Sequence, residues 1–271
     1  MSDISNARSS VLAAAVSLVL VLAPVTGGAA PEFVGDGPCV WSGKYKDWVY
    51  QERQLISTFT RPLDLEQARQ LVPAPFVLAE KPHVRISMLD LYEMAVGPPY
   101  KEAEVSLLVT YKGETGWYIV YLPVTDPDAC GAGVMNEGFP KVVRKVSIDR
   151  DHATFTGTLY APGGQRPEFV FHLAFSDEAL TAEARAAMDD LTQYPSYTTK
   201  NGVVYRFPGY PRAIRHLGSA MPHVFQVRFG IPIVQVTGEP ASVLRRLNIA
   251  PPESGFWLKM RSRYRLNPER R

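Results

Sequence analysis

Residues 103–124 read AEVSLLVTYKGETGWYIVYLPV. Two runs of apolar, β-branched and aromatic residues, Ala103–Tyr111 and Trp117–Val124, flank the turn signal Lys112-Gly113. This arrangement predicts a pair of strands joined by a short turn. Similar runs recur from residue 53 onward between Gly, Pro and Asp signals. Their spacing favours antiparallel pairing over the alternation of strands and helices that builds a parallel sheet.

The remaining predicted strands share this composition and are Arg53–Thr60, His83–Leu91, Val142–Asp149, Ala153–Tyr160, Glu168–Phe175, His223–Phe229, Ile233–Thr237 and Phe256–Tyr264. Helical signals are fewer and shorter, and they are scattered among the strands. They predict helices at Leu65–Leu71 after Asp64, Ala182–Leu191 after Thr181, and Ala241–Leu247 after Pro240. The sequence therefore predicts a single, mainly β domain with a few short helices.

The composition is that of an ordinary globular protein. Of 271 residues, 46% are hydrophobic and 21% are charged, and the formal net charge is +2. Disorder would need lower hydrophobicity with a larger net charge, and a nucleic-acid-binding protein would show a basic excess. Basic residues alternate within Lys259–Arg265, which places them on one face of a terminal strand, so we interpret the basic tail from Arg261 to Arg271 as a solvated strand face or an oligomer contact, with no nucleic-acid partner.

The N-terminus resembles an export signal. An apolar run from Val11 to Ala23 follows Arg8 and precedes a small-residue stretch at 27–30. This run is shorter than the roughly 20 residues that a membrane-spanning helix needs, so a cleaved signal peptide is favoured over an uncleaved anchor. We expect a signal peptide at 1–30, a linker at 31–50, the domain at 51–266 and a tail at 267–271, in a secreted or periplasmic protein without a stable membrane anchor.

The two cysteines, Cys39 and Cys130, lie 91 positions apart. Export would place them in an oxidising compartment, where they could pair. The sequence alone does not show whether their Cα atoms come within the roughly 7 Å that a disulfide requires. The pairing therefore stays open. Two cysteines without a C-x-x-C spacing or a nearby histidine cluster do not predict a zinc site.

The segment from Gly133 to Lys141 reads GVMNEGFPK and joins a small-residue turn to a predicted strand. Lys141 follows Phe139-Pro140 and precedes Val142-Val143, so an inward side chain would be surrounded by apolar groups. Burial disfavours the ammonium form, and a free amine can form a Schiff base with a ketone. The alternative is a lysine at the start of a strand whose ammonium group reaches water.

Two elements of the sequence resemble the acetoacetate decarboxylase superfamily in order and spacing. One is Gly138-Phe139-Pro140-Lys141, and the other is Tyr100-Lys101-Glu102, with the strand at 118–122 between them. The resemblance runs from Arg53 to Lys141 and continues more faintly to residues 232–236. It implies an antiparallel sheet that closes into a barrel or cone, a homo-oligomer, a small keto-acid substrate, and chemistry that needs neither a cofactor nor a metal.

The resemblance also implies roles for individual residues. Lys141 matches the Schiff-base lysine, Glu102 the acid/base glutamate, and Arg53 the arginine that helps to receive the substrate carboxylate. Phe139 and Ser87 stand at positions that face the substrate. The alternatives are a salt bridge on a strand surface for Arg53 and a solvated loop carboxylate for Glu102.

Four positions depart from the family pattern. Val142 replaces a second lysine, Ser87 replaces a second glutamate, and Gly133-Val134-Met135 replaces a Gly-Arg-Glu element. Serine cannot substitute for a carboxylate electrostatically, so the decarboxylase assignment is weakened more than the lysine chemistry. We expect decarboxylation of a β-keto acid. The alternatives are aldolase-dehydratase or hydratase chemistry at the same lysine, and a secreted, non-catalytic protein that binds a small ligand.

Overall fold

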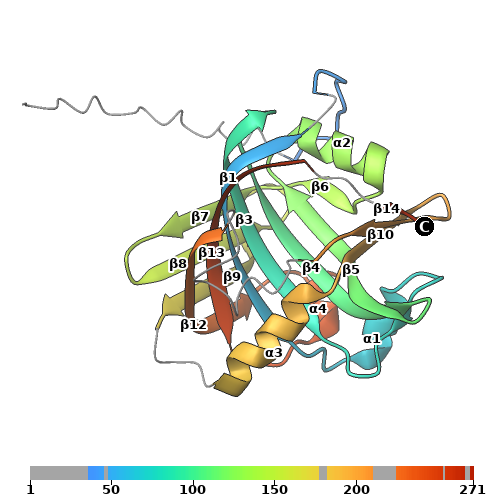
Figure 1. Cartoon of the computed structure of the whole chain (residues 1–271), viewed down its shortest axis with the longest axis vertical. Helices are drawn as coiled ribbons and strands as arrows, with labels where there is room; N and C mark the ends of the chain where they lie inside the picture. The colour runs from blue at the N-terminus through green and yellow to red at the C-terminus, as the bar shows by residue number, and fades with distance from the viewer. Residues whose placement is uncertain (1–35, 46–47, 177–181, 210–223, 253, 266–268) are drawn as a thin grey trace, which may run out of the picture.

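The structure, a computed structural model, describes residues 36–45, 48–176, 182–209, 224–252, 254–265 and 269–271 (Figure 1). The predicted signal peptide at 1–30 lies outside the described residues, as do Thr181 and His223. Within the described part of the chain, no helix is both long and apolar enough to cross a membrane.

The described elements are mainly strands. The strands are β1 Val49–Thr60, β2 Val77–Leu78, β3 Val84–Val96, β4 Tyr100–Tyr111, β5 Glu114–Val124, β6 Lys141–Val143, β7 Val146–Arg150, β8 Thr154–Tyr160, β9 Pro167–Phe175, β10 Ser196–Lys200, β11 Val203–Phe207, β12 Val224–Val236, β13 Gly255–Arg265 and β14 Glu269–Arg270. The helices are α1 Leu65–Gln70, α2 Pro127–Glu137, α3 Ala182–Gln193 and α4 Val243–Leu247. The mainly β prediction is confirmed.

The strands form one 14-stranded sheet in the order β14-β11-β10-β5-β4-β3-β1-β13-β12-β9-β8-β7, with β2 on β4 and β6 on β5. Figure 1 shows that the sheet is strongly curved, with α2 at one end of it and the other helices toward the opposite end. Most pairs are antiparallel, as predicted, but β5 pairs in parallel with both β6 and β10. This order has two ends among the described residues, so the expected closure into a barrel or cone is not confirmed.

The hairpin of β4 and β5 is confirmed. Tyr111 pairs with Glu114 across the turn, whose residues Lys112 and Gly113 both have positive φ. Side chains alternate between the two faces of β4. Ala103 and Val105 enter the large apolar cluster on one face, whereas Glu102 lies on the other face. The second face therefore carries polar groups in the middle of a buried sheet.

Strand β12 shows one correction to the predicted boundaries. We expected two strands there, but β12 runs without interruption. Its first half pairs with β13, its second half pairs with β9, and Gly230 pairs with both strands. Pro232 pairs only with β9, which leaves its missing N–H on an unpaired side. The change of partner strand at Gly230 thus explains why Gly230 and Pro232 resemble a strand boundary in the sequence.

Helix α2 is a further correction, because we expected a small-residue turn there. Asp126 caps the helix by accepting a hydrogen bond from the Ala129 amide, and Pro127 occupies the first turn. The small residues let other parts of the chain approach the helix closely: a Cβ at Gly131 would press on the backbone of Val40 and Trp41. Packing of this kind outweighs the low helix propensity of glycine. The sequence reading also omitted β2, β10, β11 and β14 and merged β6 with β7.

Candidate active site

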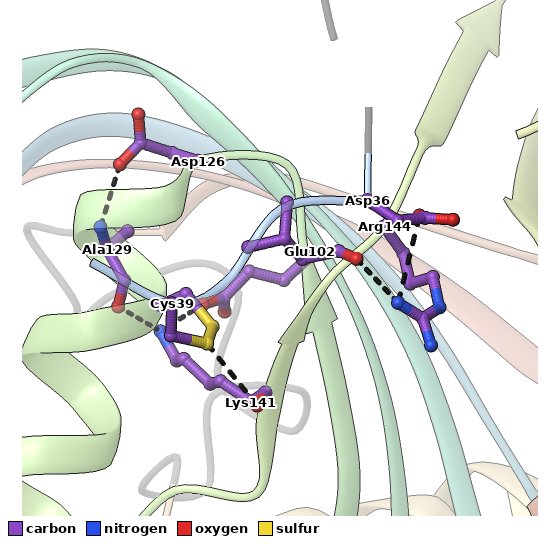
Figure 2. Close-up of a disulfide and its surroundings, with 9 residues drawn as sticks. Asp36, Cys39, Glu102, Asp126, Ala129, Lys141 and Arg144 are labelled. Carbon is purple, nitrogen blue, oxygen red and sulfur yellow. Dashed lines mark hydrogen bonds and ion pairs between the residues drawn. A yellow bond between two sulfur atoms is a disulfide. The ribbon is translucent and has the colours of Figure 1, made fainter. Parts of the chain in front are cut away.

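Lys141 opens β6 directly after α2. Gly138 ends the helix with a φ of 66°, a conformation that glycine adopts without steric cost. Phe139 and Pro140 then lead into β6, where Lys141 pairs with Leu122 of β5. The chain therefore brings Lys141 back beside the helix that precedes it. Figure 2 shows its side chain pointing toward Glu102 and the Ala129 carbonyl group.

The ammonium group of Lys141 is buried and paired. Its Nζ atom donates to Oε1 of Glu102 at 2.7 Å and lies 3.5 Å from the carbonyl oxygen of Ala129. The side chains of Lys141 and Glu102 are only 7% and 11% exposed. The rings of Tyr100 and Phe139 lie 5.5 Å and 5.4 Å from Nζ. A lysine that reaches water and a solvated loop glutamate are therefore both wrong descriptions of these residues.

Titratable groups near the lysine are shifted toward their neutral forms. Burial raises the pKa of the Tyr100 phenol well above its usual range, and the nearby Glu102 carboxylate raises it further. Burial also raises the pKa of Glu137 to about 7, although Lys141 opposes the shift. Burial raises the pKa of Asp126 as well, although the hydrogen bond from the Ala129 amide opposes this shift. Tyr100 is therefore an O–H donor at neutral pH.

Arg53 lies on the same face of the sheet as Glu102. Leu55 pairs with Leu89, and Leu89 pairs with Glu102, so Leu55 lies in the same row across the sheet as Glu102. Arg53 precedes Leu55 by two residues on β1, so its side chain projects from the same face. Arg53 is 8% exposed, which contradicts a salt bridge on a strand surface. Its guanidinium carbon lies 5.6 Å from the centre of the Tyr50 ring. The Tyr50 hydroxyl is 3.1 Å from the Tyr100 hydroxyl, so a row of side chains connects Arg53 to the lysine.

The positions that depart from the family pattern have defined places. Ser87 of β3 is buried, and its hydroxyl oxygen lies 2.9 Å from that of Ser57. Val142 pairs with Pro123 and, as the next residue on the strand, projects to the opposite side from Lys141. Gly133, where the chain keeps the glycine of the family element, lies inside α2, where an added Cβ would be 2.9 Å from Cδ and Cε of Lys141. The Gly133 position therefore leaves room for the lysine side chain.

Phe139 contributes to the wall of the site. Its ring packs against Phe207 at a centroid distance of 4.8 Å and also faces the Lys141 ammonium group. Sequence reasoning gave no role to Tyr50, Tyr100 or Glu104, although Tyr100 belongs to a quoted motif. The alternation of Tyr100, Glu102 and Glu104 along β4 is the signal that could have identified Tyr100 and Glu104. Tyr50 lies on β1 and is not part of this alternation.

A disulfide joins Cys39 to Cys130 beside the lysine, and their Cα atoms are 5.0 Å apart. In Figure 2 the Cys39 sulfur faces the carbonyl oxygen of Lys141, at a distance of 3.7 Å. The segment that carries Cys39 is also tied to α2, since the Val40 amide donates to the Pro127 carbonyl oxygen at 3.0 Å. The N-terminal segment is thereby fastened to α2, the helix that packs beside Lys141 and β6.

Comparison with known proteins identifies the family. A sequence model described as acetoacetate decarboxylase matches residues 42–228. An acetoacetate decarboxylase of Streptomyces nogalater is 28% identical over 183 residues, which cover 68% of this chain and 70% of that protein.

Two solved structures share the fold. One comes from structural studies of acetoacetate decarboxylase; it has a TM-score of 0.64 and 17% identity, with 83% of this chain and 88% of that chain covered. The other is the enduracididine biosynthesis enzyme MppR in complex with pyruvate; it has a TM-score of 0.60 and 11% identity, with 83% and 90% of the chains covered. With the family model spanning most of the domain, the chain belongs to the acetoacetate decarboxylase family.

Proposed function

We propose that this protein is a lyase that forms a Schiff base between Lys141 and a small keto acid, and that it decarboxylates a β-keto acid. The observation that carries the proposal is the buried pair in which Nζ of Lys141 lies 2.7 Å from Oε1 of Glu102. A carboxylate at this distance can accept the proton of the ammonium group and leave a free amine. A free amine can attack a ketone.

The reaction then follows from the arrangement of the groups. Arg53 binds the substrate carboxylate through charge-assisted hydrogen bonds, which orients the ketone toward Lys141. Nζ adds to the ketone carbon, and loss of water gives an iminium. The bond to the carboxylate breaks, its electron pair moves into the iminium, and carbon dioxide leaves behind an enamine. Protonation of the enamine carbon and hydrolysis of the resulting iminium release the ketone product and the free lysine.

Glu102 is the proposed proton carrier in these steps. It contacts Nζ directly, so it can take a proton before addition and return one to the carbinolamine oxygen that leaves as water. Tyr100 stays protonated because burial raises its pKa well above the usual range. Its hydroxyl can therefore donate a hydrogen bond within the row that runs from Arg53 to Lys141.

Aldol or dehydration chemistry at the same lysine is the second candidate, and Ser87 favours it. A carboxylate at this position would raise the energy of a bound substrate carboxylate, whereas the Ser87 hydroxyl, hydrogen-bonded to Ser57, does not. The driving force for loss of carbon dioxide is correspondingly smaller. MppR supports this candidate, since solved structures show it with pyruvate and with the condensation product of pyruvate and imidazole 4-carboxaldehyde.

We also propose that the protein is exported after removal of residues 1–30 and that it acts as a homo-oligomer. The disulfide between Cys39 and Cys130 supports export, because disulfides persist in oxidising compartments and are rare in the cytosol. Membership of the acetoacetate decarboxylase family supports both the small keto-acid substrate and the oligomer.

Borohydride trapping tests the proposed function. The protein is incubated with acetoacetate or pyruvate and reduced with borohydride, and its peptides are then analysed by mass spectrometry. We expect a reduced adduct on Lys141, and we expect none in Lys141→Met. Lys145→Met is the matched control, because Lys145 lies near the same strand but faces the Tyr160 ring at 4.5 Å. Lys145→Met should form the reduced adduct on Lys141 to the same extent as the unmodified protein.

Product analysis separates the two reactions. Release of carbon dioxide from acetoacetate identifies decarboxylation, whereas condensation of pyruvate with an added aldehyde identifies aldolase-dehydratase chemistry. If no short keto acid is trapped on Lys141, the Schiff-base proposal is wrong and the non-catalytic, ligand-binding alternative is favoured.

A further inference from the structure

A short segment before β1 lies along the first turn of α2. We call this segment, residues 39–42, the strap. The Val40 amide donates to the Pro127 carbonyl oxygen at 3.0 Å. The amide and the hydroxyl group of Ser42 both donate to the Asp128 carboxylate at 2.8 Å, and these two contacts are exposed to water. Exposed hydrogen bonds add little to stability, because water competes for the same groups.

The disulfide is the covalent link between the strap and the helix. Cys130 is fully buried, whereas Cys39 is half-buried. Val40 and Trp41, which follow Cys39, are 51% and 44% exposed, so the strap buries little apolar surface. The family model begins at residue 42, so Cys39 precedes the part of the chain that the model matches. Opening the bridge would leave the strap with weak contacts to α2.

The two ends of α2 are held in different ways. Its buried residues are all small, so they bury little area with which to fix the helix: Ala129, Cys130, Gly131, Ala132 and Gly133. At the C-terminal end, the Thr198 hydroxyl of β10 donates to the Glu137 carbonyl oxygen. The Lys200 ammonium group of β10 donates to the Met135 carbonyl oxygen. The disulfide supplies the covalent tie at the N-terminal half, which is the half that carries Ala129.

The bridge lies against the surroundings of Lys141 on two sides. Cys130 directly follows Ala129, whose carbonyl oxygen lies 3.5 Å from Nζ of Lys141. The Cys39 sulfur lies 3.7 Å from the carbonyl oxygen of Lys141 (Figure 2). Ala129 and Cys130 share one buried cluster with Tyr100, whose ring lies 5.5 Å from Nζ. A shift of this half of α2 would therefore displace groups that flank the amine.

We propose that Cys39 and Cys130 are positioning residues and that formation of their disulfide switches on the Lys141 site. The reduced chain keeps its fold, but the N-terminal half of α2 shifts and attack of Nζ on a keto acid is slow. In the oxidation step the two thiols form an S–S bond and pass two electrons and two protons to a disulfide oxidant, which becomes a dithiol. The inference rests on the proposed function, because Schiff-base formation is the step that the bridge controls. An exported chain would become active only in the oxidising compartment.

The test measures trapping of acetoacetate on Lys141 by the full chain in its oxidised and reduced forms. Cyanoborohydride is the trapping reagent, because it reduces iminiums and leaves disulfides intact. The bridge is opened with a dithiol, which is then removed under argon, and circular dichroism reports on the fold. We expect a roughly 10- to 100-fold lower saturated trapping rate in the reduced form, the effect of misplacing the reacting atom by up to about 1 Å. The half-saturating concentration, which depends on Arg53, should change by less than about threefold, and reoxidation should restore the rate.

Two variants separate positioning from stability. Cys39→Ala lacks the bridge and should trap at the slow rate whether or not the dithiol has been used. Leu244→Ala is the matched control, because Leu244 is 2% exposed in α4 and its truncation destabilises a fold about as much as the loss of a disulfide. Leu244→Ala keeps the bridge, so its oxidised form should trap at the unmodified rate.

Equal saturated rates in the two folded forms would overturn this proposal and leave the proposed function intact. Loss of the circular dichroism signal on reduction would also overturn the proposal, because the bridge would then act only on the fold. A slow, folded Leu244→Ala would have the same consequence, since stability alone would then set the rate. Absence of trapping in both forms would overturn the proposed function, and this inference with it.

Discussion

Replacing Gly133 by alanine should damage the chemistry of Lys141 more than it damages the fold. The new Cβ would lie 2.9 Å from Cδ and Cε of Lys141 and 3.3 Å from Nζ, whereas ordinary contacts begin near 3.4 Å. The lysine side chain must therefore move by roughly 0.5–1 Å. It has little room to do so, because the Tyr100 and Phe139 rings flank the ammonium group and Glu102 holds it.

Two opposing terms keep the cost in stability small. Alanine in place of glycine inside a helix contributes about 1 kcal/mol, and overpacking costs about 1–3 kcal/mol. The net loss should be about 0–2 kcal/mol. A misplacement of about 1 Å at the reacting atom can lower a rate by roughly 100-fold. We therefore expect a 10- to 100-fold slower trapping of Lys141 with only a modest fall in Tm.

Gly131→Ala is the control in the same helix. Its Cβ would press on the backbone of Val40 and Trp41, away from the lysine. This variant should lose more stability than Gly133→Ala, yet trap at nearly the unmodified rate while folded. Trapping rates come from quenched mass spectrometry, and Tm comes from circular dichroism. A Gly133→Ala protein that reacts as fast as the unmodified chain would refute the packing argument.

Three further changes probe the site and its supports. Glu102→Gln removes the proton carrier and should slow adduct formation on Lys141 by about 10²–10⁴-fold, measured as a trapping rate; an unchanged rate would assign proton transfer to another group. Cys39→Ser opens the bridge to Cys130 and should cost roughly 2–5 kcal/mol, measured by denaturant unfolding, and a change below about 0.5 kcal/mol would contradict this. Burial raises the pKa of Glu137 from 4.5 to about 7, so the folded state binds this proton more tightly and its stabilising contribution is lost as the pH rises through that range. Glu137→Gln should therefore flatten the fall in Tm between about pH 4.5 and pH 7, and parallel Tm curves for the two proteins would argue against the shift.

Local patterns predicted the long strands β1, β3, β4 and β5 but missed the short strands β10 and β11. Two apolar runs and a Lys-Gly turn predicted the β4–β5 hairpin, and the structure confirms it. Prediction failed where packing overrides local preference. Gly131 and Gly133 lower the helix propensity of α2, but they also let Val40, Trp41 and Lys141 come close to it. Only the packed fold shows that their small size is needed.

The sequence by itself determined the fold class, because alternation is a property of neighbouring residues, and its resemblance to the acetoacetate decarboxylase family singled out Lys141 together with Glu102 and Arg53. The structure decided how distant residues are placed around the lysine. Glu102 reaches it from 39 positions away, and Cys39 pairs with Cys130 across 91 positions. The register of β1, β3 and β4 also decided that Arg53, Glu102 and Glu104 follow one another on one face. Register is fixed by the summed packing of whole strands, so no short segment encodes it.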